Sequence, residues 1–134
     1  MLAPMRLLIV RHAEAASGLP DELRPLTPHG RQQARALGRR LLAESLAPDA
    51  VLTSPLLRAR ETGAELGLQE PEVDDRLAPG ASPAAYRNAI RGRGETVLVV
   101  GHQPDCGRVA AALTGEAEPP FPPCGLAVLE LEAP

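Results

Sequence analysis

Three short apolar runs, at residues 6–10, 50–53 and 96–100, are the feature that most limits how this chain of 134 residues can fold. Each run has the length of a buried strand, and longer segments with helical spacing separate the runs. Strands that alternate with helices are typical of an α/β layered sheet. The length of the chain is that of one compact domain, so we expect a single domain over residues 1–134.

The boundaries of the helices are marked by local signals. Three hydroxyl-proline pairs place an acceptor at the N-cap and a proline at the first helical position: Thr27-Pro28, Ser54-Pro55 and Ser82-Pro83. Gly67 and Gly92 are suited to the left-handed conformation that follows a helix end. We predict strands over 5–10, 50–53, 96–100 and 126–131, an extended piece near 72–74, and helices over 28–46, 55–66, 83–91 and 105–114. The proline-rich residues 118–123 are predicted to form a loop.

The composition excludes several classes of function. All 14 basic residues are arginines, which rules out a P-loop lysine and Schiff-base chemistry. A net charge of -3 with no basic run argues against binding to nucleic acid. Residues 7–10 are too few for a signal-peptide core or a membrane span. We therefore expect a cytoplasmic protein with no membrane partner.

The two cysteines, Cys106 and Cys124, fit neither a disulfide framework nor a metal-ligand pattern, and we expect both to be reduced and structural. A Cys-x5-Arg phosphatase loop is absent, because Ala112 and Glu130 lie six positions after the cysteines. We also expect no metal and no cofactor, since arginines close to the histidines His12 and His102 would repel a divalent cation.

Polar residues suited to phosphate chemistry follow all three apolar runs. Arg11-His12 follows the first run, Ser54 and then Arg58 follow the second, and His102 follows the third. In an open α/β sheet, ligands bind beyond the carboxyl ends of the strands. If these strands are parallel neighbours, the two histidines and two arginines meet in one pocket with the positive end of a helix. Such a pocket suits a dianion.

The residue types indicate their roles. Arg11 and Arg58 offer planar donor forks for phosphate oxygens. A neutral imidazole at His12 can attack phosphorus and form a covalent phosphohistidine. His102 can donate to the phosphoryl oxygens as charge develops on them. Arg24, in the loop before the first helix, is either a further phosphate ligand or a surface residue.

Four separated motifs resemble the signature of the histidine phosphatase superfamily. They are Arg11-His12-Ala13, the stretch Leu26-Thr27-Pro28-His29-Gly30, the segment from Ser54-Pro55 through Arg58 to Glu61-Thr62, and Gly101-His102. The short length, Arg24-Pro25-Leu26-Thr27 and the proline-rich turn most resemble bacterial phosphohistidine phosphatases of the SixA type. The resemblance implies a three-layer sandwich with a mostly parallel central sheet. It also implies that His12 is the phosphorylated nucleophile in a pocket of Arg11, Arg58 and His102.

Two positions depart from the pattern of the superfamily. Ala13 stands where glycine is usual, which adds a methyl group to the turn. Pro79 stands where many relatives carry a glutamate that protonates the leaving alcohol. Since an alkoxide leaves poorly without a proton donor, this loss favours a phosphorylated histidine as the substrate. Glu14, Asp74 and Asp75 are the candidates for a substitute acid.

We therefore expect a metal-independent phosphatase that removes phosphate from a histidine-phosphorylated protein. The alternatives are a phosphomonoesterase for a small molecule, which requires a substitute acid, and a module that binds phosphate without turnover.

Overall fold

Five strands form one sheet in the order β3-β2-β4-β1-β5 in the computed structural model, which describes residues 4–132. Positions 1–3 and 133–134 of the predicted domain lie outside the described residues. The strands are β1 (Pro4–Arg11), β2 (Ala50–Thr53), β3 (Pro71–Val73), β4 (Thr96–Gly101) and β5 (Leu126–Glu132). β5 runs antiparallel to β1, and the other neighbouring pairs are parallel. The prediction of a mostly parallel sheet is confirmed.

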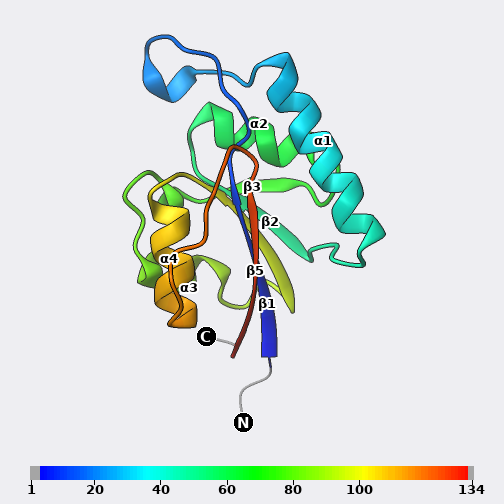
Figure 1. The fold of residues 1–134 in the computed structure, drawn as a ribbon, viewed down its shortest axis with the longest axis vertical. Helices are drawn as coiled ribbons and strands as arrows, with labels where there is room; N and C mark the ends of the chain where they lie inside the picture. Colours follow the sequence, from blue (N-terminus) through cyan, green and yellow to red (C-terminus); the bar gives the residue numbers. More distant parts are fainter. Residues whose placement is uncertain (1–3, 133–134) are drawn as a thin grey trace.

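Helices cover both faces of the sheet (Figure 1). α1 (Pro28–Ala43) and α2 (Leu57–Glu65) lie on one face, and α3 (Pro83–Ile90) and α4 (Asp105–Thr114) lie on the other. Two 3-10 turns, η1 (Asp21–Leu23) and η2 (Asp75–Leu77), were not predicted. Among the described residues, no helix has the length and apolar character needed to cross a bilayer. The molecule is the predicted α/β domain of three layers.

The side chains of β1 alternate between two cores. Leu7 and Ile9 pack in the cluster that α3 and α4 cover, whereas Leu8 and Val10 pack in the cluster beneath α1 and α2. All four side chains are fully buried. Burial on both faces explains why the strand has a continuous apolar sequence, as parallel central strands do.

Two of the three predicted N-caps are confirmed, and one is wrong. The Thr27 hydroxyl accepts a hydrogen bond from the Gly30 N–H, and the Ser82 hydroxyl accepts one from the Ala85 N–H. Ser54, however, does not cap α2, which begins at Leu57 with Leu56 as its N-cap. The Ser54 hydroxyl is used elsewhere, because it contacts the His102 ring and the Leu56 N–H.

The predicted helix ends are close to the observed ones. Gly67 and Gly92 have φ angles of 68° and 72°, in the left-handed region as expected. The first helix ends at Ala43 rather than at residue 46, because Ser45 adopts a φ of 58° that a right-handed helix does not allow.

The register of the three central strands brings their carboxyl ends into one line. Arg11 pairs with Gly101 across β1 and β4, and Thr53 pairs with Val100 across β2 and β4. The ladder continues one residue further, since the His12 N–H donates to the Gly101 carbonyl at 3.0 Å. Ser54, His102 and His12 therefore follow three adjacent strands, with His102 in the middle.

Gly30 allows α1 to start against the segment that follows His12. A Cβ at this position would overlap the backbone carbonyl of Glu14. The same carbonyl accepts the Thr27 N–H at 3.0 Å, so the start of the helix is fixed to the loop after β1.

We predict that Gly30→Ala lowers the free energy of unfolding by about 1–2 kcal/mol. Overpacking against a backbone group costs up to about 3 kcal/mol, and the gain in helix propensity offsets about 1 kcal/mol of this cost. Chemical denaturation measures this change. Gln32→Ala, at an exposed position of the same helix, serves as the control and should stay within about 0.5 kcal/mol of the parent. A Gly30→Ala protein as stable as the parent would show that the helix start is not tightly packed.

Candidate active site

The rings of His12 and His102 lie next to each other at the carboxyl ends of β1 and β4. Their ring centroids are 5.3 Å apart, and the ring planes are inclined by 55°. His102 is buried, and His12 is partly exposed. Two histidines separated by most of the sequence therefore share one site, as their positions after parallel strands predict.

The orientation of the His12 ring is set by the chain that follows it. Nδ1 of His12 lies 2.8 Å from the carbonyl oxygen of Ala13. A carbonyl oxygen accepts only, so Nδ1 carries the hydrogen and donates it, and Nε2 keeps its lone pair. In the neutral ring, Nε2 is therefore the nitrogen with an available lone pair.

Ala13, the departure from the usual glycine, is accommodated without strain. Its backbone is not in the left-handed region, and its methyl group is buried beside Leu26 and Ala34. Its N–H donates to the Thr62 hydroxyl at 3.0 Å, and that hydroxyl donates to the Arg58 carbonyl at 2.7 Å. The buried Thr62 thus ties the turn after His12 to the first turn of α2.

Arg11 is held by the proline-rich loop. Its Nη1 donates to the backbone carbonyl of Phe121 at 3.0 Å. Phe121 belongs to residues 118–123, which form a loop before β5 as predicted. This loop, for which the sequence offered no chemical role, therefore orients one of the predicted phosphate-binding arginines.

Arg58 is buried, and only 8% of its side chain is exposed. Its Nη1 donates to the Asp21 backbone carbonyl at 2.9 Å, and its Nη2 lies 3.3 Å from Asp21 Oδ2. Glu61, three positions further along α2, does not pair with Arg58, because it binds Arg31 and the Leu26 N–H instead. The guanidinium lies below the surface, where a charge needs a partner.

Asp21 connects two arginines, and sequence reasoning missed it. Its carboxylate accepts from Arg24 Nε at 2.9 Å as well as from Arg58. Arg24 also donates to the Ala16 carbonyl, and its charge acts on the pKa of His12. Arg24 is therefore connected to Arg58 through Asp21. The signal in the sequence was an acidic residue three positions before Arg24, which is too common a spacing to single out.

Three nitrogens of these side chains are buried with no hydrogen-bond partner among residues 4–132: Arg11 Nε, Arg58 Nε and His102 Nδ1. Buried donors in folded proteins are nearly always paired. Their occurrence together on Arg11, Arg58 and His102 is what a binding site for an oxyanion requires, because phosphoryl oxygens accept from such donors.

Both histidines are held in the neutral state. Burial is the main cause that lowers the pKa of His12 to about 4, and the charges of Arg58, Arg11 and Arg24 add to it, against the hydrogen bond to Ala13. Burial also lowers the pKa of His102 to about 3, with contributions from His12 and Arg58. At neutral pH the site therefore combines cationic guanidinium groups with two uncharged imidazoles.

The three carboxylates proposed as substitute acids are engaged elsewhere or exposed. The Glu14 carboxylate lies 3.8 Å from His29, whose side chain is largely exposed. Asp74 binds Arg76, and this contact lowers the pKa of Asp74 although burial opposes it. Asp75 is exposed in η2.

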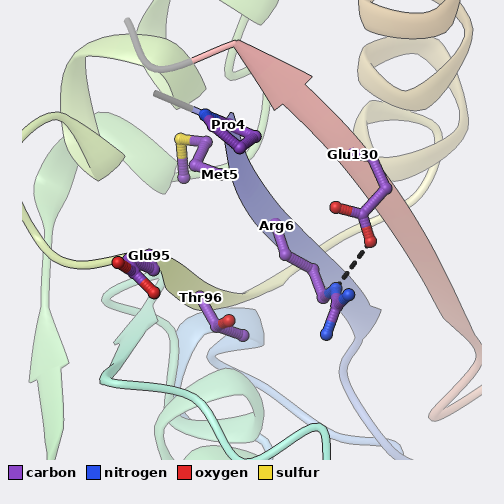
Figure 2. Close-up of a pocket in the computed structure, with 6 residues that line it drawn as sticks. All are labelled: Pro4, Met5, Arg6, Glu95, Thr96 and Glu130. Carbon is purple, nitrogen blue, oxygen red and sulfur yellow. Dashed lines mark hydrogen bonds and ion pairs between the residues drawn. The ribbon is translucent and has the colours of Figure 1, made fainter. Parts of the chain in front are cut away.

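A pocket at the opposite end of the sheet is lined by no histidine. Figure 2 shows its lining by Pro4, Met5, Arg6, Glu95, Thr96 and Glu130, at the amino ends of β1 and β4. Arg6 is already paired with Glu130 at 2.6 Å. In the part of the chain that the structure describes, no three His, Cys, Asp or Glu side chains are grouped to hold a metal ion.

Comparisons with known proteins show the family to which this chain belongs. The model of the histidine phosphatase superfamily (branch 1) matches residues 7–79. This chain belongs to the histidine phosphatase superfamily. It is 34% identical to the phosphohistidine phosphatase SixA of Escherichia coli, over 96% of this chain and 86% of that protein. It is also 36% identical to an uncharacterised protein of Mycobacterium tuberculosis, over 91% of this chain and 87% of that one.

Superfamily membership is also visible in three dimensions. The structure of the protein histidine phosphatase SixA complexed with tungstate superposes with a TM-score of 0.83 at 30% identity, covering 96% of this chain and 97% of that one. The superfamily fold and its phosphatase hydrolase class are therefore assigned to this chain.

We predict that the His12 ring titrates near pH 4, well below the ordinary histidine pKa of 6.5. Arg58→Gln should raise this midpoint, because it removes a positive charge that opposes protonation of the ring. Ring-proton NMR across pH 3–8 measures both values. Arg39→Gln, at an exposed position of α1, is the matched control and should leave the midpoint unchanged. A parent midpoint near 6.5 would contradict the burial and charge described for the site.

Proposed function

We propose that this protein is a phosphohistidine phosphatase that acts on a histidine-phosphorylated protein through a covalent phosphohistidine at His12. The observation that carries the proposal is the orientation of His12, whose Nδ1–H is held by Ala13 so that Nε2 is free beside buried, unpaired donors of Arg11, Arg58 and His102. Arg11, Arg58 and His102 bind the phosphoryl oxygens, and Arg24 extends the cationic surface at the mouth.

In the first step, Nε2 of His12 bonds to phosphorus while the P–N bond of the substrate breaks. The departing imidazole takes the electron pair of that bond. Because its other nitrogen already carries a proton from solvent, it leaves as a neutral molecule. The negative charge on the transferring phosphoryl group is balanced by the guanidinium groups and the imidazole donor.

In the second step, water attacks the phosphorus of phospho-His12. The P–N bond breaks, its electron pair returns to Nε2, and the proton of the attacking water passes to solvent or phosphate. Nδ1 keeps its hydrogen throughout, since the Ala13 carbonyl binds it. His12 is therefore regenerated in the neutral form that started the cycle, and no metal takes part in our scheme.

The carboxylates around the site support an N–P substrate over an alkyl ester. Pro79 stands at the position of the acid that many relatives use, and Glu14 and Asp74 face His29 and Arg76. Asp21 lies at the arginines, but their charges lower its pKa despite the opposing effect of desolvation, so it stays ionised and is a poor proton donor. An imidazole leaving group needs no such donor.

The loop between β1 and α1 supports a protein substrate. It carries Asp21 and Arg24, and two of its three leucines are exposed, Leu19 by 94% and Leu23 by 56%. Figure 1 shows the loop projecting from the carboxyl-end edge of the sheet. Exposed leucines beside a charged pocket are suited to contact another protein. The similar Escherichia coli protein is named as a phosphohistidine phosphatase, and the similar solved structure holds tungstate, an oxyanion.

We predict that brief incubation with a histidine-phosphorylated carrier protein labels His12 with an acid-labile phosphoryl group. His12→Ala abolishes the label and lowers turnover by at least about 10³-fold, because loss of a nucleophile removes the covalent route. Acid quench followed by gel autoradiography measures the label. His29→Ala, an exposed histidine outside the site, is the control that keeps both label and turnover. Phosphate release that continues in His12→Ala would contradict the proposed nucleophile.

A second prediction concerns the bond that is cleaved. N-phosphohistidine and para-nitrophenyl phosphate, whose leaving groups need no proton donor, should turn over faster than glycerol 3-phosphate by at least about 100-fold, since general acid catalysis contributes about 10²–10⁴-fold. Steady-state phosphate release on the three compounds measures this. Equal or faster turnover of the alkyl ester would favour the small-molecule phosphomonoesterase, and binding of phosphate without any turnover would favour the recognition module.

A further inference from the structure

The buried hydroxyl of Ser54 contacts His102 directly. Ser54 Oγ lies 2.7 Å from His102 Nε2. Both residues are buried, since Ser54 has no exposed surface and His102 is only 4% exposed. The same oxygen accepts the Leu56 N–H at 3.2 Å. The serine that the sequence marks as an N-cap of α2 is thus committed to the histidine instead.

The hydrogen-bond partners of Ser54 and His102 determine which ring nitrogen of His102 carries the hydrogen. A serine hydroxyl has one hydrogen to donate and oxygen lone pairs to accept with. The Leu56 N–H occupies an acceptor position of Ser54, and within residues 4–132 the one contact that can take the hydroxyl hydrogen is His102 Nε2. The hydroxyl therefore donates to Nε2. In a neutral imidazole the hydrogen then resides on Nδ1.

The opposite tautomer is unfavourable here. If Nε2 carried the hydrogen, the Ser54 hydroxyl hydrogen would be left without an acceptor at a site that solvent does not reach. Nδ1 would then present a lone pair, and a lone pair cannot bind an anionic oxygen. Leaving a buried polar group unpaired costs free energy, so the first arrangement is preferred.

We propose that Ser54 is a positioning residue that holds His102 as the Nδ1–H tautomer, so that the ring presents a donor to the phosphoryl group. Nδ1 is the ring nitrogen that is buried without a protein partner. Each histidine of the site then has one nitrogen fixed by the protein and the other left for phosphorus chemistry. At His12 the fixed atom is Nδ1, and at His102 it is Nε2. One ring is prepared to accept phosphorus and the other to donate a hydrogen.

The tautomer is tested by ¹⁵N NMR of protein labelled at its histidines, using long-range correlations at pH 7.5. We expect a protonated Nδ1 and an unprotonated Nε2 for His102, and the same assignment for His12. His102 is identified from its disappearance in His102→Gln. Observation of a protonated Nε2 at His102 in the parent protein would overturn the proposal, with no variant of Ser54 required.

The catalytic consequence, which rests on the proposed function, is tested with Ser54→Ala and N-phosphohistidine as the probe. We expect mixed tautomers at His102. We also expect kcat to fall at least about tenfold while KM changes by less than about twofold, because removal of a partner that orients a catalytic ring lowers activity by about 10-fold or more. Ser54→Thr, which keeps the hydroxyl, should restore both the NMR pattern and kcat. A single Nδ1–H tautomer and full kcat in Ser54→Ala would overturn the positioning role.

Ser82→Ala is the control, because it also removes a serine hydroxyl that accepts a backbone N–H, at the exposed start of α3. It should lower thermal stability while leaving the His102 nitrogen shifts and kcat unchanged. A similar loss of kcat in Ser82→Ala would show that general destabilisation explains the Ser54 effect. If no variant shows phosphatase activity but the Nδ1–H tautomer is observed, the proposed function fails and the tautomer assignment stands.

Discussion

The parallel register of β1, β4 and β2 is the constraint on which the site depends. Because Arg11 pairs with Gly101 and Thr53 pairs with Val100, the residues that follow each strand emerge side by side. Backbone hydrogen bonds from His12 to Gly101 and from Ser54 to Val100 extend this alignment past the last paired residue. The distance between the two imidazoles is therefore set by the sheet, and the apolar residues on both faces of β1 hold that sheet in place.

Arg11 and Arg58 bring positive charge below the surface of the protein. Carbonyl and carboxylate oxygens of the fold offset the cost of burying these two guanidinium groups. The Phe121 carbonyl binds Arg11, and Asp21 binds Arg58 through both its backbone and its carboxylate. A buried guanidinium is costly unless it is hydrogen-bonded. The same positive charges, together with burial, disfavour a proton on either histidine. In the proposed function the arginines thus have two effects, since they bind the phosphoryl oxygens and keep the His12 ring neutral.

Local signals in the sequence predicted the elements well, because strand length, hydroxyl-proline pairs and glycines after helices act over a few residues. The expectation that His12, His102, Arg11 and Arg58 meet at one edge of the sheet rested on the assumption that the strands are parallel neighbours, which β2, β4 and β1 are. Contacts between distant segments were not predictable. The link between Asp21 and Arg58 spans 37 positions, and that between Ser54 and His102 spans 48. Ser54 was misread as a cap because a serine before proline has that meaning locally, and only the neighbouring strand reveals the competing acceptor.

The position of these strands within the sheet has a dynamic consequence. Ser54, His102 and His12 follow β2, β4 and β1, which occupy the interior of the order β3-β2-β4-β1-β5. Edge strands separate from a sheet at lower free energy than interior strands do, so transient opening of β3 or β5 leaves the two imidazoles in register. The amide hydrogens of β4 and β1 that hold His102 and His12 in register should accordingly belong to the slowest-exchanging part of the molecule.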